Sequence, residues 1–113
     1  MTVTDPIIDP VGPVLQTGDV ARAVAEAAAT DNPGKRVDVR DKGSYMRVEV
    51  EGGECILRRA TIAEELGRPF KMAELELIMP SFVGRIHTSS DVFRFYLGAE
   101  TMARHAGSEE THS

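Results

Sequence analysis

The chain has 113 residues, the length of a single domain, and its 42% hydrophobic and 27% charged residues exclude wholesale disorder. A formal net charge of −5 argues against a nucleic-acid partner, because such binding depends largely on Lys and Arg side chains that neutralise phosphates. A local basic patch stays open as an alternative, with four candidates interleaved among acids: Arg58, Arg59, Arg68 and Arg85.

The sequence also indicates where the protein resides. No apolar run approaches the roughly 18 residues of a membrane span, and the N-terminus shows no secretory signal. Cys55 is the single cysteine, which excludes an internal disulfide framework and a four-cysteine metal site. We therefore expect a cytoplasmic protein with no membrane partner.

Three regions are expected along the chain. Residues 1–10, with Pro6 and Pro10, predict a flexible N-terminal arm. Residues 11–98 predict the folded domain, and the polar residues 99–113 predict a mobile C-terminal tail.

The first elements of the domain are a strand and a helix. Residues 11–15 predict a short strand in which Pro13 suits an edge position. An apolar stripe at helical spacing then predicts an alanine-rich helix: Val20, Ala23, Val24, Ala27 and Ala28. Asp19 or Thr17 is expected to cap its N-terminus, and the Asp-Asn-Pro-Gly run at 31–34 is expected to end it.

Three strand-like segments follow. Two apolar sets alternate with polar residues and predict strands with one dry face and one wet face: Val37 and Val39, then Met46, Val48 and Val50. The side chains between them, Glu49 included, are expected to face solvent. A glycine turn at 51–54 leads into a third strand at 55–58, so the last two strands are expected to form a hairpin.

Two short helices are expected next. Thr61 and Glu64 form a capping-box pattern that predicts the start of a helix, and Gly67 predicts its end. Residues 71–78 fit either a helix or a strand, and their Met, Ala, Glu and Leu residues favour a helix.

Two strands, near 85–87 and 92–97, complete the predicted domain. The second groups three apolar side chains on one face that closes the core: Phe93, Phe95 and Leu97. The predicted order is β-α-β-β-β-α-α-β-β. We therefore expect an α+β domain of mostly antiparallel strands in two small sheets, packed with short helices.

No catalytic or metal-binding pattern stands out. Glu109 and His112 form one Glu-x-x-His pair, whereas a diiron site in a helix bundle needs two. His87 has no ligand-type neighbour at suitable spacing, and no nucleotide-binding glycine loop or serine-nucleophile motif is present. Cys55 predicts a structural thiol, and four glutamates fit capping and solvated faces better than an acid–base pair: Glu64, Glu65, Glu74 and Glu76. We expect no catalytic residue, no metal and no cofactor.

The stretch 66–86 has a different character, because it combines helix breakers and apolar residues with few charges after Glu76. Four apolar side chains there either fill the core or form an exposed surface for a partner: Ile78, Met79, Phe82 and Val83. Phe82 and Arg85 are residue types that commonly anchor interfaces.

Five segments of the chain, in order, carry a family resemblance. They are VGPV at 11–14, DNPGK at 31–35, LGRPFKMAELE at 66–76, PSFVGRI at 80–86 and FRFYL at 93–97. In these segments the chain resembles the small coupling (effector) proteins of bacterial multicomponent soluble diiron monooxygenases. It looks most like those that serve toluene, alkene and isoprene monooxygenases.

The resemblance implies a non-catalytic α+β protein without a bound metal or organic cofactor. It implies that the partner is the hydroxylase component, whose own four-helix bundle holds the diiron centre. The effector would shift the conformation of that site to promote dioxygen activation and coupled hydrocarbon oxidation. An electron donor, a ferredoxin or reductase, would compete for an overlapping surface. The hydrocarbon, whether alkene, diene or aromatic, is a property of the hydroxylase.

Carried onto this sequence, the resemblance implies eight partner-binding residues: Asn32, Met79, Pro80, Ser81, Phe82, Val83, Gly84 and Arg85. Pro80 and Phe82 depart from the methane-oxidising branch, which has smaller polar residues there. Two alternatives stay open from the residues themselves. One is a small-molecule-sensing α+β regulatory module, which would need an apolar pocket with convergent polar groups. The other is a small hydrolase or isomerase that uses the glutamates.

Overall fold

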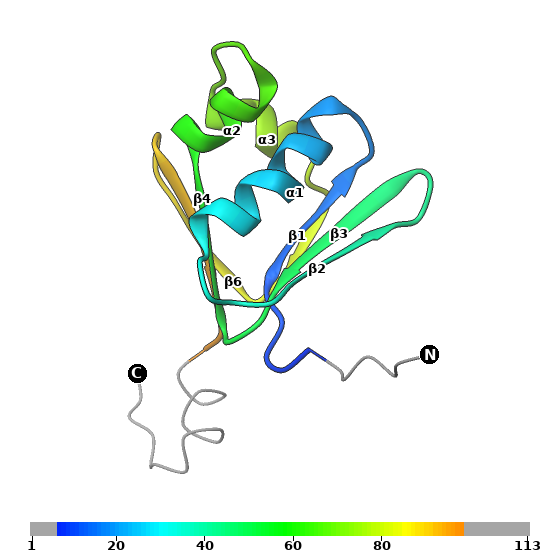
Figure 1. Ribbon diagram of the computed structural model, residues 1–113, viewed down its shortest axis with the longest axis vertical. Coiled ribbons are helices and arrows are strands. Elements are labelled where there is room, and N and C mark those ends of the chain that lie inside the picture. Colours follow the sequence, from blue (N-terminus) through cyan, green and yellow to red (C-terminus); the bar gives the residue numbers. More distant parts are fainter. Residues whose placement is uncertain (1–6, 99–113) are drawn as a thin grey trace.

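The apolar patterns become seven strands and three helices within the residues that the computed structural model describes, 7–98 (Figure 1). In chain order these elements are β1 (Gly12–Gln16), α1 (Asp19–Asp31), β2 (Val37–Asp41), β3 (Tyr45–Val50), β4 (Glu54–Arg58), α2 (Arg59–Leu66), α3 (Met72–Leu77), β5 (Ser81–Val83), β6 (Arg85–Thr88) and β7 (Val92–Tyr96). The α+β class and the predicted order are confirmed. The short strand β5 is additional, in a segment that was expected to lead into the next strand.

The strands form two antiparallel sheets. The first has the order β2-β3-β1-β5, and the second has the order β4-β7-β6. Figure 1 shows the two sheets diverging from the end of the molecule where β3 passes into β4, with the helices between them. Since α1 contacts strands of both sheets and also α2, the inner faces and the helices share one core.

That core follows most of the predicted faces, but Val39, which was expected on the dry face of its strand, is 40% exposed. The buried side of α1 consists mainly of small side chains, which let the helix approach the sheets closely: Ala21, Ala23, Val24, Ala27 and Ala28. Phe93 and Phe95 of β7 are among the largest fully buried side chains, as expected from their shared face. Burial of such apolar surface is the main favourable contribution to folding.

The hairpin expected at the 51–54 turn is wrong. β3 pairs with β1 and β2, whereas β4 pairs with β7, so the turn carries the chain from one sheet to the other. Gly52 and Gly53 have φ angles of 98° and 82°, and their N–H groups donate to the carbonyl oxygens of Ile8 and Asp9. A glycine pair permits either a tight hairpin or this crossing, and only the distant partners of β3 and β4 decide between them. The two carbonyl contacts also tie part of the predicted arm to the domain.

Pro13 does not lie at a sheet edge, because β1 is flanked by β3 and by β5. Its cross-strand neighbour on β5 is Phe82. The three-residue strand β5 takes the edge position instead, and its shortness limits the exposed ladder of backbone groups.

The starts of the first two helices differ from the predicted caps. Gly18 is the N-cap of α1, and the Asp19 carboxylate accepts a hydrogen bond from the next backbone N–H. α2 begins at Arg59, two residues before Thr61, so the predicted capping box is wrong. The Thr61 hydroxyl donates instead to Asp31 at 2.7 Å, because a tertiary partner on α1 lies within reach.

Two other helix predictions are confirmed. Gly67 ends α2 in the left-handed conformation, with φ of 74°. The ambiguous segment at 71–78 is helical over α3, where the Glu74 carboxylate accepts a hydrogen bond from the Lys71 N–H at 3.2 Å.

Glu49 contradicts its expected solvent exposure. It lies on the outer face of β3, yet only 7% of the residue is exposed, with its carboxylate 3.7 Å from the Arg47 guanidinium. The segment before β1 runs past this end of β3, where Val11 and Val50 exchange backbone hydrogen bonds. Alternation alone therefore assigns to solvent a position that the fold buries.

Candidate partner-binding surface

The predicted contact segment forms the corner where the chain passes from the first sheet to the second. β5 is the edge strand of the first sheet, and β6 is an edge strand of the second. Gly84 joins them with φ of 100°, and a Cβ there would meet the Tyr96 carbonyl oxygen at 2.8 Å. Glycine is therefore required at this corner by both backbone conformation and space.

Phe82 is both a core contact and an exposed ring. Its neighbour Pro13 is buried, so this pair points inward from the first sheet. The Phe82 ring lies 5.8 Å, centroid to centroid, from the buried ring of Phe95 in the second sheet. It nevertheless leaves 37% of the residue exposed. The ring thus joins the edges of the two sheets and presents apolar surface to solvent.

The other predicted contacts differ in exposure. Met79 and Val83 are partly buried, and Met79 packs against the core. Four are exposed: Pro80, Ser81, Gly84 and Arg85. Together with Phe82 these residues form one strip along the corner, which we call the corner strip (residues 79–85).

Leu77 was missed as a contact candidate, although it is 82% exposed and lies two residues before the corner strip. Met72 and Leu75 define the buried face of α3. Leu77 lies two residues beyond Leu75, a rotation of about 200° around the helix. The helical spacing therefore contained the signal that this leucine points away from the core.

Asn32 lies elsewhere and is buried, at 3% exposure. Its side-chain amide donates to the carbonyl oxygens of Ala28 and Ile56, and its side-chain oxygen accepts from the Ile56 N–H. Ile56 belongs to β4, at the opposite edge of the second sheet from β6. The side chain of Asn32 thus holds α1 to the sheet, and a contact with a partner would require breaking these bonds.

The described residues hold no arrangement suited to metal or nucleophilic chemistry. Within residues 7–98 no group of three His, Cys, Asp or Glu side chains is placed to bind a metal ion. Burial raises the pKa of the Cys55 thiol to about 12, so it stays protonated at neutral pH. The Glu109–His112 pair lies outside the described residues. Among the described helices none is long and apolar enough to cross a bilayer.

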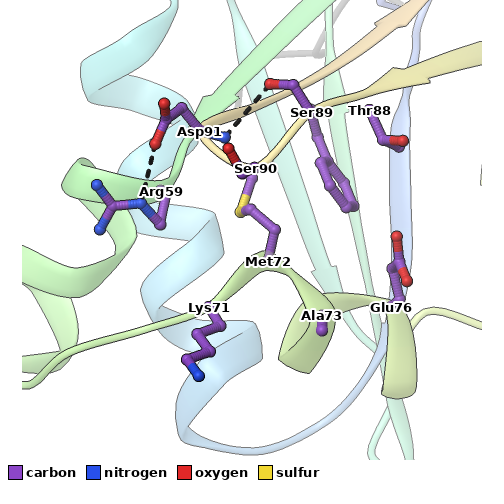
Figure 2. Close-up of a pocket in the computed structure, with 10 residues that line it drawn as sticks. Arg59, Lys71, Met72, Ala73, Glu76, Thr88, Ser89, Ser90 and Asp91 are labelled. Atoms are coloured by element: carbon purple, nitrogen blue, oxygen red, sulfur yellow. Dashed lines mark hydrogen bonds and ion pairs between the residues drawn. The ribbon is translucent and has the colours of Figure 1, made fainter.

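A hollow of about 490 Å³ lies between α3 and the turn that joins β6 to β7 (Figure 2). Figure 2 shows Met72 reaching from α3 toward Ser90, and Arg59 paired with Asp91. The Arg59 Nε lies 3.2 Å from the Asp91 carboxylate. The Ser89 hydroxyl accepts hydrogen bonds from the backbone N–H groups of Asp91 and Val92 within the turn. Ser89 and Asp91 thus use their polar groups within the turn and in the ion pair with Arg59.

Comparison with known proteins identifies the class. Residues 9–96 match the model of the MmoB/DmpM family. The effector subunit of the alkene monooxygenase system of Xanthobacter autotrophicus Py2 is 44% identical over 95 residues, which cover 84% of this chain and 93% of that protein.

Solved structures have the same fold. A chain of the phenol hydroxylase–regulatory protein complex superposes with a TM-score of 0.65 at 26% identity, covering 79% of this chain and 98% of that one. The methane monooxygenase regulatory protein B superposes with a TM-score of 0.60 at 23% identity, covering 100% of this chain and 79% of that one. In kind, the protein is a regulatory component of a multicomponent monooxygenase and not a catalytic one. The chain belongs to the MmoB/DmpM family.

Proposed function

We propose that the protein binds the hydroxylase component of a soluble diiron monooxygenase through the corner strip and the adjoining Leu77. The observation that carries this proposal is the exposure of two large apolar side chains in this segment: Leu77 at the end of α3 is 82% exposed, and Phe82 on β5 is 37% exposed. Exposed apolar side chains gathered on a soluble domain commonly mark an interface. The 44% identity to an alkene monooxygenase effector supports a hydroxylase as the partner.

The proposed mechanism is thermodynamic linkage. An effector shifts a hydroxylase between two conformations only by its difference in affinity for them. A coupling free energy of about 1–3 kcal/mol would change the populations about 5–150-fold. By favouring one conformation of the diiron site, the effector would promote dioxygen activation and coupled hydrocarbon oxidation. The reactive metal belongs to the hydroxylase, so the effector needs a rigid contact surface and no reactive group.

The proposal has two further parts. A ferredoxin or reductase would compete for an overlapping surface of the hydroxylase, so adding the donor to a preformed complex should displace the effector. The location would be cytoplasmic, which is supported by one buried, protonated cysteine that needs no oxidising compartment.

The test is calorimetric titration of variants into the cognate diiron hydroxylase. Leu77→Ser and Phe82→Ala should each raise Kd about tenfold or more, equivalent to about 1.4 kcal/mol. Phe82→Ala should also lower stability by about 1–2 kcal/mol, because it removes a partly buried ring from Phe95. Leu77→Ser separates binding from folding, because its side chain is almost fully exposed.

Val39→Ser is the matched control. Val39 is 40% exposed, and it lies on β2, at the opposite edge of the first sheet from β5. Its Kd should stay within about twofold of the wild-type value. Unchanged affinity in both Leu77→Ser and Phe82→Ala would remove the corner strip from the interface.

A further inference from the structure

The outer face of the second sheet carries a surface that the corner strip does not include. Phe93 and Phe95 of β7 point into the core, so Arg94 and Tyr96 point outward. The strand register places His87 beside Arg94 and Arg85 beside Tyr96. On the other side, Ile56 of β4 is also opposite Arg94. We call this surface the outer sheet face, defined by Ile56, Arg58, Arg85, His87, Arg94 and Tyr96.

The outer sheet face differs in charge from the helical layer. Its three strands carry Arg58, Arg85 and Arg94 but one acidic residue, Glu54. The three helices carry seven acids, three in α1 and two each in α2 and α3, against Arg22 and Arg59. An acidic protein therefore concentrates positive charge on one sheet face and negative charge on the opposite, helical layer.

Two arginines of the outer sheet face, Arg94 and Arg58, have acidic partners and are still exposed. Arg94 pairs with the Glu54 carboxylate, and its guanidinium lies 4.4 Å from the centre of the Tyr96 ring. Its side chain remains 43% exposed, and that of Arg58 is 57% exposed. The Asp31 carboxylate, whose side chain is only 4% exposed, lies 3.9 Å from the Arg58 guanidinium. Glu54 and Asp31 are thus engaged within the domain, and Asp91, which lines a hollow with Arg58, pairs with Arg59. With three arginines and one acid on its strands, the face carries net positive charge.

The face is also open within the described part of the chain. Figure 1 shows the helices on the inner side of the second sheet, between the two sheets. Ile56, Val92 and Tyr96 are each partly exposed on the outer side, among the arginines. An apolar centre with arginine and tyrosine at hand is the usual composition of a protein interface.

We infer that the outer sheet face docks on an acidic surface of the hydroxylase, an inference that rests on the proposed function. Arg85 joins the two surfaces, because it ends the corner strip and starts β6 on the outer sheet face. An acidic partner surface would attract this face and repel the acidic helical layer, so charge would set the orientation in which the effector approaches. The corner strip would supply apolar contacts. The outer sheet face would guide the approach of the effector to the hydroxylase and fix its orientation there.

The experiment measures hydroxylase affinity at about 50 and 200 mM NaCl, since exposed charge pairs are screened over this range. Wild-type affinity should fall several-fold at the higher salt concentration. His87→Glu and Arg58→Gln should each weaken binding about five- to tenfold at low salt and reduce the salt dependence. His87→Glu suits the purpose, because His87 is exposed and a carboxylate there would lie opposite Arg94 without burying charge.

Arg22→Glu is the matched control, since Arg22 is exposed on α1 in the acidic helical layer. It changes the net charge at least as much as the test variants and should leave affinity within about twofold. Thermal unfolding of each variant checks that the fold is retained. Normal binding by both His87→Glu and Arg58→Gln, with Leu77→Ser still weakened, would overturn this inference and leave the proposed function standing. No binding of the wild-type chain to the hydroxylase would overturn both.

Discussion

Gly84 and Gly43 both have positive φ angles, 100° and 93°, but their surroundings differ. A Cβ on Gly43 would meet nothing within 4 Å, whereas one on Gly84 would meet the Tyr96 carbonyl oxygen at 2.8 Å and a Val11 methyl at 3.0 Å. The pair therefore separates the cost of backbone conformation from the cost of crowding at the corner between the sheets.

We predict that Gly43→Ala lowers the free energy of unfolding by about 1–2 kcal/mol, the cost of a left-handed backbone for a residue with a Cβ. Gly84→Ala should cost about 1–3 kcal/mol more, because the added methyl also overpacks the corner. Urea denaturation of both variants measures the difference. Equal losses would show that the corner relaxes and that space does not require glycine there.

Cys55 gives a second prediction at this scale. Its pKa is raised by burial from 9.0 to about 12, so between these pH values the folded chain holds a proton that the unfolded chain has lost. Stability from this group is full below about pH 9 and falls by about 1.4 kcal/mol per pH unit above it. Cys55→Ala should lack this component, so the stability difference between the two proteins should shift in favour of the variant from pH 9 to 11. A constant difference would contradict the buried, protonated thiol.

At the scale of the element, the end of α1 completes the second sheet. Asn32 pairs with both the N–H and the C=O of Ile56, as a neighbouring strand would. On either side of it the Asp31 carboxylate accepts from the Arg58 N–H, and the Lys35 ammonium donates to the Glu54 carbonyl. The outer edge of β4 is therefore covered by the Asp-Asn-Pro-Gly-Lys segment. These residues satisfy backbone groups that would otherwise be open to pairing with another strand.

We predict that Asn32→Ala destabilises the fold by about 2–4 kcal/mol, because it removes three hydrogen bonds and leaves the groups of Ile56 unpaired. Thr30→Ala is the matched control, because Thr30 is exposed on α1 two residues before Asn32. It should change stability by less than about 0.5 kcal/mol. Chemical denaturation measures both. A variant of Asn32 with unchanged stability but weakened hydroxylase binding would instead restore this residue as a partner contact.

At the scale of the whole molecule, regulation without chemistry predicts a chain that is inert alone. The purified protein should contain no stoichiometric iron by atomic absorption and should turn over no hydrocarbon. Added to the hydroxylase and its electron donor, it should raise the yield of oxidised product per electron consumed. Iron bound at one equivalent, or turnover by the chain alone, would contradict an accessory role.

Much of the fold was accessible from short-range patterns. The alanine stripe of α1, the inward Phe93 and Phe95, and the end of α2 at Gly67 are all as predicted. The sequence also predicted residues 79–85, the corner strip, as a partner contact. Because the Phe82 ring is partly exposed, these residues remain a candidate interface. Predictions failed where one local pattern is compatible with two structures. The Gly52-Gly53 turn could have closed a hairpin, but it carries the chain from one sheet to the other.

The sequence by itself determined the class, the elements and their buried faces, because periodicity and glycine positions act within a few residues. Only the tertiary structure decided strand partners, the burial of Asn32 and the collection of Arg58, Arg85 and Arg94 on one face. These features depend on contacts between residues tens of positions apart. Such contacts are selected by packing the whole core at once, and no local pattern encodes that choice.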